Sequence, residues 1–233
     1  MEKAGLIVEP EWDTPEYYLS EGELTKATDK IKNEIAKIDI HATDEEKVTN
    51  IMKWMNSVTK RESNSKDHKK FNKTAEEILE DKLRTGCSDS AVLYSTVARA
   101  MGIPTMQIQS MDIDWAIKVK NKEKIDGLYG HFYCASYLET MPGKFKWYLI
   151  DTDMPQRRVM DEKYNPLIEF NINDRNIDRN RYAYAYTIDS KEIEIEGQKM
   201  DSIEKNGKVM FKVIEEANFK DIGKNKDEKQ DRS

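Results

Sequence analysis

The sequence predicts an α+β fold in which helices come first and an antiparallel sheet follows. Up to Pro104 the apolar residues recur mainly with helical spacing, and beyond it they form short strand-like runs. This order, helices and then strands, is typical of α+β proteins. A chain of 233 residues fits one elaborated domain, so we expect one main domain.

Three helices are predicted before residue 84. Apolar positions within 24–38 follow helical spacing opposite Lys and Glu, which indicates a surface helix. Two further helices begin at capping boxes, Thr followed three residues later by Glu, at Thr43 and Thr74. The stripe within 48–58 should face the core.

A fourth helix is predicted to begin near Cys87. Gly86 interrupts the chain just before it, and Gly102 and Pro104 end the apolar stripe that follows. Cys87 therefore lies at a helix N-terminus. The segment 60–73, between the second and third helices, is polar and basic without a stripe, so we expect a loop there.

Runs of apolar, β-branched and aromatic residues predict the strands. These are 106–108, 129–138, 145–151, 182–188, 193–195 and 209–214. The second and third flank Met141-Pro142-Gly143, which indicates a hairpin.

We divide the chain into four parts. Residues 1–42 form an irregular arm and an accessory helix, and 43–160 form the core. Residues 161–218 add strands that complete the same domain. The charged tail 219–233 is predicted to be disordered.

The charge pattern excludes several partners. Lys and Arg number 38 against 44 Asp and Glu, interspersed, with a net charge of −6, which disfavours nucleic acid. No stretch approaches the roughly 18 apolar residues of a membrane span, so we expect no membrane insertion. As written, the chain is expected to be cytoplasmic, or extracellular if it is a processed fragment. The sequence leaves the oligomeric state open.

The two cysteines indicate a free thiol. They are too few for a disulfide scaffold, and neither belongs to a CxxC or a zinc-type cluster. Asp112 and Asp114 lack the further oxygen ligands that calcium needs, so we interpret them as a solvated strand edge. We expect no metal and no cofactor.

Cys87 is the candidate nucleophile. A cysteine attacks carbonyl carbon only as thiolate, which a helix N-terminus and a nearby imidazolium both stabilise. The imidazole in turn needs a carboxylate that fixes its orientation and tautomer. His131 and Asp151, on the two strands of the predicted hairpin, can supply that pair.

Three blocks of the sequence resemble the transglutaminase-like superfamily. Residues 74–104, which end in R-A-M-G-I-P, look like its nucleophile helix. Residues 130–138 look like its histidine strand, and 147–153 look like its W-x-x-x-D strand. The blocks stand in the family's order, and the resemblance covers about residues 43–155. The sequence departs from the pattern in that Gly86 directly precedes the cysteine and in that Tyr133 stands where Trp is usual.

The resemblance implies a papain-like core in which the nucleophile helix packs on an antiparallel sheet, here with extra N-terminal helices. It implies a Cys87-His131-Asp151 triad that acts on amide bonds of a peptide or protein through a thioester. We favour hydrolysis, as in a cysteine peptidase or amidase, because water needs no second binding site. The alternatives are a non-catalytic binding module on this fold and a protein-crosslinking transglutaminase.

Other residues near the motifs have simpler interpretations. Strand alternation places Cys134 on the face opposite His131, where a small core residue is expected. Asp153 could compete with Asp151 for the role of the carboxylate that orients His131. Trp54 is interpreted as core packing, although the resemblance allows an oxyanion donor or a pocket wall in this region. The segment 175–186 is interpreted as an exposed strand with its loop.

The triad places a condition on the hairpin, because His131 and Asp151 must point to one face. A regular two-residue turn at Pro142-Gly143 would put them on opposite faces. We therefore predict an odd-length loop or a β-bulge between residues 138 and 145.

Overall fold

The protein is described by a computed structural model. It describes residues 14–39, 41–62, 73–112, 114, 117–118, 121, 123, 130–153, 167–171, 176–178 and 181–190. The strands predicted at 193–195 and 209–214, the tail 219–233 and most of the N-terminal arm lie outside the described residues.

The helices precede most of the sheet, as the sequence predicts. They are η1 (Pro15–Leu19), α1 (Asp29–Ile35), α2 (Asp44–Val58), α3 (Ala75–Asp81) and α4 (Cys87–Ala100). Both predicted capping boxes are present, since Thr43 and Thr74 each exchange hydrogen bonds with the Glu three residues on. The fourth helix begins at Cys87 itself, and Gly102, with φ of +82°, follows its end.

The first predicted helix is shorter than expected. The spacing predicted a surface helix over 24–38, but α1 begins only after Thr28, whose hydroxyl caps the backbone N–H of Ile31. Leu24 and Ala27 are buried without being helical. A buried carboxylate explains the difference, because Asp189 Oδ2 accepts from the backbone N–H groups of Leu24 and Thr25 and holds them in a turn.

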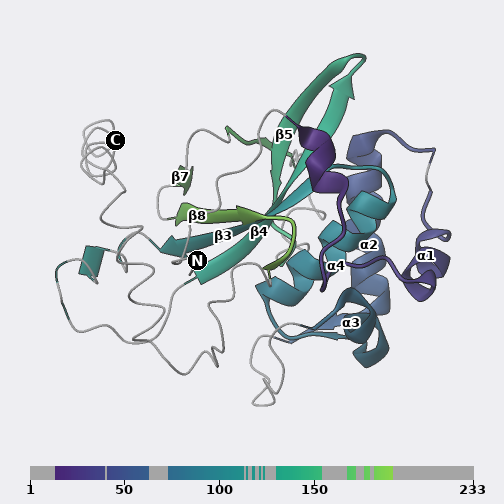
Figure 1. Ribbon diagram of the computed structural model, residues 1–233, viewed down its shortest axis with the longest axis horizontal. Coiled ribbons are helices and arrows are strands. Elements are labelled where there is room, and N and C mark those ends of the chain that lie inside the picture. Colours follow the sequence, from purple (N-terminus) through teal and green to yellow (C-terminus); the bar gives the residue numbers. More distant parts are fainter. Residues whose placement is uncertain are drawn as a thin grey trace, which may run out of the picture.

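The strands of the described residues form two sheets, and Figure 1 shows the larger one. In the small sheet β1 (Lys60–Arg61) pairs in parallel with β2 (Leu83–Arg84). The six-stranded antiparallel sheet has the order β6-β5-β4-β3-β8-β7. Its strands are β3 (Thr105–Asp112), β4 (Gly130–Met141), β5 (Lys144–Ile150), β6 (Ile168–Glu169), β7 (Asn176–Asp178) and β8 (Arg181–Thr187).

Helix α4 lies at the centre of the core. It packs against β3 and β4 and against the other three α-helices, and every residue from Asp89 to Arg99 is buried. Alternate residues of β4 and β5 face this helical side, among them Cys134, Leu138 and Ile150. The residues between them face a second cluster on the other side of the sheet, which Tyr18 of η1 covers by packing edge-on against Trp147. Helix α4, which begins at Cys87, therefore packs on an antiparallel sheet, as the resemblance implies.

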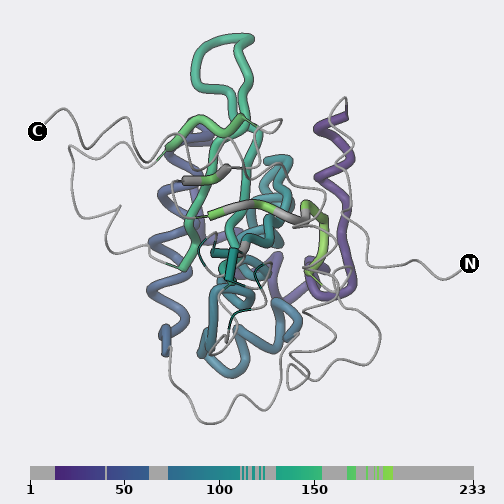
Figure 2. The backbone as a smooth tube through the Cα atoms, turned by 90° about the vertical axis from the view of Figure 1, so that its left-hand side faces the viewer, coloured from purple at the N-terminus to yellow at the C-terminus, as the bar shows by residue number. Residues whose placement is uncertain are grey.

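The β4–β5 hairpin fulfils the predicted register condition. It extends beyond the rest of the fold (Figure 2) and turns at Pro142-Gly143, where Gly143 has φ of +71°. From Cys134↔Ile150 to Glu139↔Phe145 the two strands pair regularly, and the residue numbers of each pair add up to 284. The register then shifts between Glu139 and Met141. The turn has two residues, and Thr140 is the extra residue of a β-bulge. The predicted β-bulge is therefore confirmed.

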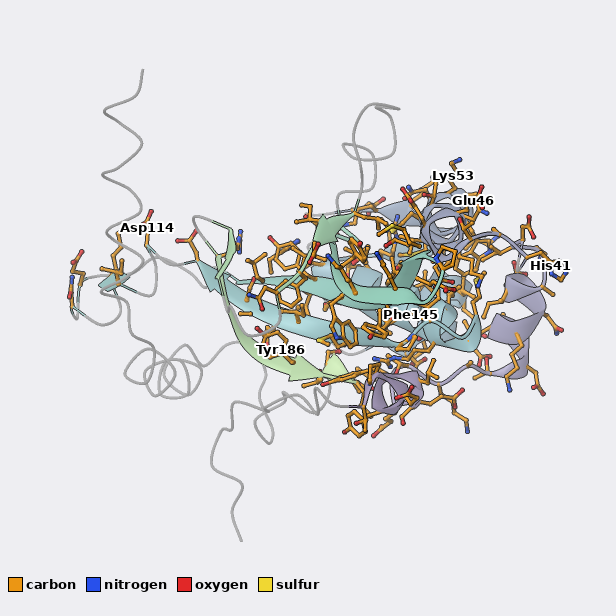
Figure 3. The ribbon with its side chains drawn as sticks, turned by 90° about the horizontal axis from the view of Figure 1, so that it is seen from above. His41, Glu46, Lys53, Asp114, Phe145 and Tyr186 are labelled. Atoms are coloured by element: carbon orange, nitrogen blue, oxygen red, sulfur yellow. The ribbon has the colours of Figure 1, made fainter. Side chains whose placement is uncertain are left out.

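One interpretation of a strand segment is wrong. Strand β8 lies between β3 and β7 with Ala183 and Tyr186 buried, so it is not an exposed strand. Asp112 is the last residue of β3, half-buried and opposite Arg181 of β8. Asp114 is exposed and lies away from helices α1–α4 (Figure 3).

Candidate active site

Cys87 is the first residue of α4, and hydrogen bonds hold the turn that precedes it. The Asp89 carboxylate accepts from the backbone N–H of Thr85 at 2.8 Å and from its hydroxyl at 2.9 Å. Gly86 occupies the N-cap, where no side chain caps the helix. The first N–H groups of a helix have no partner within it and carry partial positive charge, so this end favours a thiolate or an oxyanion. The Cys87 side chain is partly exposed.

His131 and Asp151 meet across the hairpin. His131 Nε2 donates to Asp151 Oδ1 at 3.1 Å, and the two side chains are only 12% and 9% exposed. If the register of the hairpin continues, His131 lies opposite Asp153 and diagonal to Asp151 on one face. The ring of Tyr133 packs edge-on against the imidazole at 4.5 Å between centroids, which restrains its orientation.

The surroundings of His131 favour the imidazolium. Burial by itself lowers the pKa of His131, but hydrogen bonds to Asp151 and Cys87 and the negative charges of both groups outweigh it. Together they raise its pKa from 6.5 to about 9. His131 therefore lies between a thiol and a carboxylate, as an imidazole in a thiol triad must. The structure brings all three predicted residues together.

Asp153 has partners of its own. Its carboxylate is bound by the guanidinium of Arg61 and accepts from Ser90 Oγ at 3.2 Å. Its backbone N–H donates to Asp151 Oδ1 at 3.2 Å. The carboxylate that contacts His131 is therefore Asp151, which was preferred from the sequence.

A second guanidinium supports the segment before Cys87. Arg84 is fully buried and donates to Thr59 Oγ1 at 2.8 Å and to Asn56 Oδ1 at 2.8 Å. Burial lowers the pKa of Arg84, as expected for a cation removed from water. These contacts join the end of α2 to β2, three residues before the thiol.

Cys134 and Trp54 are both buried. Cys134 is fully buried on the helical side of the sheet, with Sγ 3.6 Å from the carbonyl oxygen of Ala91, as predicted for a core residue. Trp54 is buried in the core, and its Nε1 has no hydrogen-bond partner among the described residues. In the part of the chain that the structure describes, no three His, Cys, Asp or Glu residues gather as a metal site. The helices described there are also too short or too polar to cross a bilayer.

Sequence reasoning missed two residues beside the site, Arg61 and Asp89. Asp89 belongs to the C-x-D motif of the resemblance and could have been found there. Arg61 carries no motif, because its position depends on the pairing of β1 with β2, in which Arg61 lies beside Arg84, 23 positions further along the chain.

A partly exposed thiol at a helix N-terminus, next to an imidazole that binds a carboxylate, is the arrangement of papain-like thiol enzymes. The family comparison agrees with it: the model described as "Transglutaminase-like superfamily" matches residues 30–152, more than half of the chain. The protein belongs to the transglutaminase-like superfamily.

No curated protein matches the chain. Among solved structures, one from Cytophaga hutchinsonii described as a "putative cysteine protease" is similar, with 16% sequence identity and a TM-score of 0.46. The match covers 80% of this chain and 50% of the other, so this chain spans about half the length of that one.

Proposed function

We propose that the protein is a thiol-dependent acyl-transfer enzyme that hydrolyses amide bonds of a peptide or protein through Cys87, His131 and Asp151. The observation that supports it is the position of His131, which donates to Asp151 Oδ1 and lies near enough to Cys87 for the thiolate to help raise the pKa of His131. Neither contact alone would distinguish a catalytic histidine from a core histidine.

The first half of the reaction forms a thioester. The thiolate of Cys87 attacks the amide carbonyl carbon, and the oxygen becomes an oxyanion near the N-terminus of α4. The backbone N–H of Cys87 is the first oxyanion donor, and loss of such a donor typically costs about 10²- to 10³-fold in rate. The His131 imidazolium gives its proton to the leaving amine, and Asp151 stabilises the orientation that this transfer needs.

The second half regenerates the thiol. Neutral His131 takes a proton from water, the hydroxide attacks the thioester carbonyl, and the thiolate leaves as the acid product forms. A primary amine in place of water would give transfer, as in a crosslinking transglutaminase. We prefer water because it needs no second binding site.

Trp54 is the candidate for a second oxyanion donor. Among the described residues the buried Trp54 N–H has no hydrogen-bond partner; a group of this kind typically costs about 1–3 kcal/mol, so it calls for an explanation. Trp54 lies on α2, which packs against the nucleophile helix α4. Trp54→Phe removes the indole N–H, keeps an aromatic ring at this position, and should lower turnover by about 10²-fold without lowering the rate of thiol alkylation.

The test measures both outcomes in one mixture. Denatured casein and a glutamine-containing peptide are incubated with the protein and a fluorescent primary amine at pH 7.5. Hydrolysis releases new amino groups or ammonia without incorporating the amine, whereas transfer incorporates it. Cys87→Ala is the negative control, and loss of both signals in His131→Ala is expected because the two residues act as one unit. Equal product in Cys87→Ala would contradict the proposal.

The rival function is a binding module that no longer turns over substrate. Iodoacetamide distinguishes the two cheaply, because an activated Cys87 reacts faster than free cysteine at pH 6. Alkylation no faster than that of free cysteine would favour the binding module.

A further inference from the structure

Arg61 makes a two-point contact next to the proposed site. Its Nε and Nη2 bind the two carboxylate oxygens of Asp153, with Nη2 2.7 Å from Oδ2. A fork of this kind fixes geometry as well as charge, because both N–H groups and both oxygens must stay in one plane. The two side chains are 24% and 11% exposed, so the pair is largely shielded from water.

This contact fixes a short turn on which the proposed carboxylate stands. The Asp153 backbone N–H donates to Asp151 Oδ1, the same oxygen that accepts from His131. Ser90, in the first turn of α4, holds Asp153 from the other side. A continuous set of contacts therefore runs from Arg61 through the turn to the imidazole, and from the turn to the nucleophile helix.

Arg61 reaches the turn because of the small sheet. Strand β1 pairs in parallel with β2, which places Arg61 beside Arg84 and close to the start of α4. Its guanidinium also interacts electrostatically with Cys87. Arg61 comes from a different part of the chain than any of the three proposed catalytic residues.

We infer that Arg61 is a positioning residue of the proposed reaction: by holding Asp153 in a two-point contact it keeps the Asp151 carboxylate in place to accept from His131. The inference rests on the proposed function. Through the turn, Arg61 raises the pKa of His131, whereas the positive charge of Arg61 alone would lower it.

The opposite sign makes the inference testable. A positive charge near an imidazole disfavours its protonation, so a guanidinium that acts only by charge lowers the pKa of His131. Removing such a guanidinium would raise that pKa. If Arg61 acts through the turn, its removal weakens the contact of Asp151 with His131, and the pKa of His131 falls. The other charged groups at the site stay unchanged in this comparison; they are Cys87, Arg84, Asp89, Asp151 and Asp153.

The experiment follows the imidazole signals by ¹H NMR from pH 5 to 10.5 in the full chain. Only three histidines are present, so the signal of His131 is assigned by its loss in His131→Gln. In Arg61→Gln we expect the pKa of His131 to fall by about one pH unit, tenfold in the proton-binding constant. Lys60→Gln, which removes the exposed neighbouring cation of the same strand, should leave it unchanged.

Two further variants connect the effect to the turn. Arg61→Lys keeps the charge but not the two-point contact, so the pKa of His131 should still fall. Asp153→Asn should lower it too, and Arg61→Gln added to Asp153→Asn should lower it little further, because both changes break one contact. If Arg61→Gln does not fold, Arg61→Lys decides the question by itself.

An unchanged or raised pKa of His131 in Arg61→Gln or Arg61→Lys would overturn the inference. Failure of the proposed function gives a different result. In that case Cys87→Ala leaves the pKa of His131 unchanged, and Cys87 is alkylated at pH 6 no faster than free cysteine.

Discussion

Replacing Asp151 by Asn removes the charge that the structure places on one side of His131 and keeps the shape of the side chain. The pKa of His131 is raised from 6.5 to about 9 although burial opposes the charged form. At 1.36 kcal/mol for each pH unit, the stabilisation of the imidazolium by Asp151 and Cys87 exceeds the cost of its burial by about 3 kcal/mol. We expect Asp151→Asn to remove a large part of this and to lower the pKa by at least about one pH unit.

The assay is the NMR titration of the His131 imidazole, read together with turnover. At pH 8 a pKa of about 9 leaves about nine in ten imidazoles protonated, and a fall of about 1.5 pH units leaves about one in four. The alkaline limb of the pH–rate profile should move down by the same amount. Turnover should fall less than in Cys87→Ala, because Asp151→Asn disturbs the orientation and tautomer of the imidazole and keeps the attacking atom.

The double variant Asp151→Asn/Cys87→Ala gives the strictest result. It removes both groups that raise the pKa of His131, so burial dominates and the pKa should fall below 6.5. A value that stays near 9 in the double variant would refute the assigned contacts. A larger loss of turnover in Asp153→Asn than in Asp151→Asn would show that the wrong carboxylate was assigned.

Four further predictions concern other parts of the fold. Cys87→Ala should abolish iodoacetamide labelling and Cys134→Ala should keep it, because Cys134 is fully buried; equal labelling in both would contradict this. The folded-state pKa of His131 is raised, so its contribution to stability is complete below pH 6.5 and lost as the pH rises through about 9. Urea unfolding should show this loss in the wild type and little of it in His131→Gln. Asp189→Ala leaves two buried backbone N–H groups without their acceptor and should lower the unfolding free energy by about 2–4 kcal/mol, with normal alkylation of the folded fraction. Deleting Thr140 removes the bulge and keeps the pairing beyond it, so turnover should stay above about half; loss of turnover would mean that the bulge does more than set the register.

The N-terminal segment shows how contacts distant in sequence override local spacing. Spacing alone predicted a helix from residue 24, but the Asp189 carboxylate takes the N–H groups of Leu24 and Thr25. Gly22 permits this close approach, since a Cβ there would collide with the same carboxylate. The partner is more than 160 residues away, and no local pattern points to it.

The sequence by itself determined the features that depend on neighbours within one turn or on a motif. The capping boxes of α2 and α3, the start of α4 at Cys87 and the need for a bulge in the hairpin follow from spacing of two to four residues. A helix cap or strand alternation is a short-range effect, so it can be read along the chain. The three predicted site residues followed from such local positions together with the resemblance to the transglutaminase-like superfamily.

Only the tertiary structure decided which groups surround Cys87, His131 and Asp151. Asp151 and Asp153 are two residues apart and chemically alike, and their partners distinguish them: His131 for the first, Arg61 and Ser90 for the second. Those partners come from strands and helices that meet only when the sheet closes against α4. The strength of a charge pair depends on the distance between the groups and on their burial, and neither is set by separation along the chain.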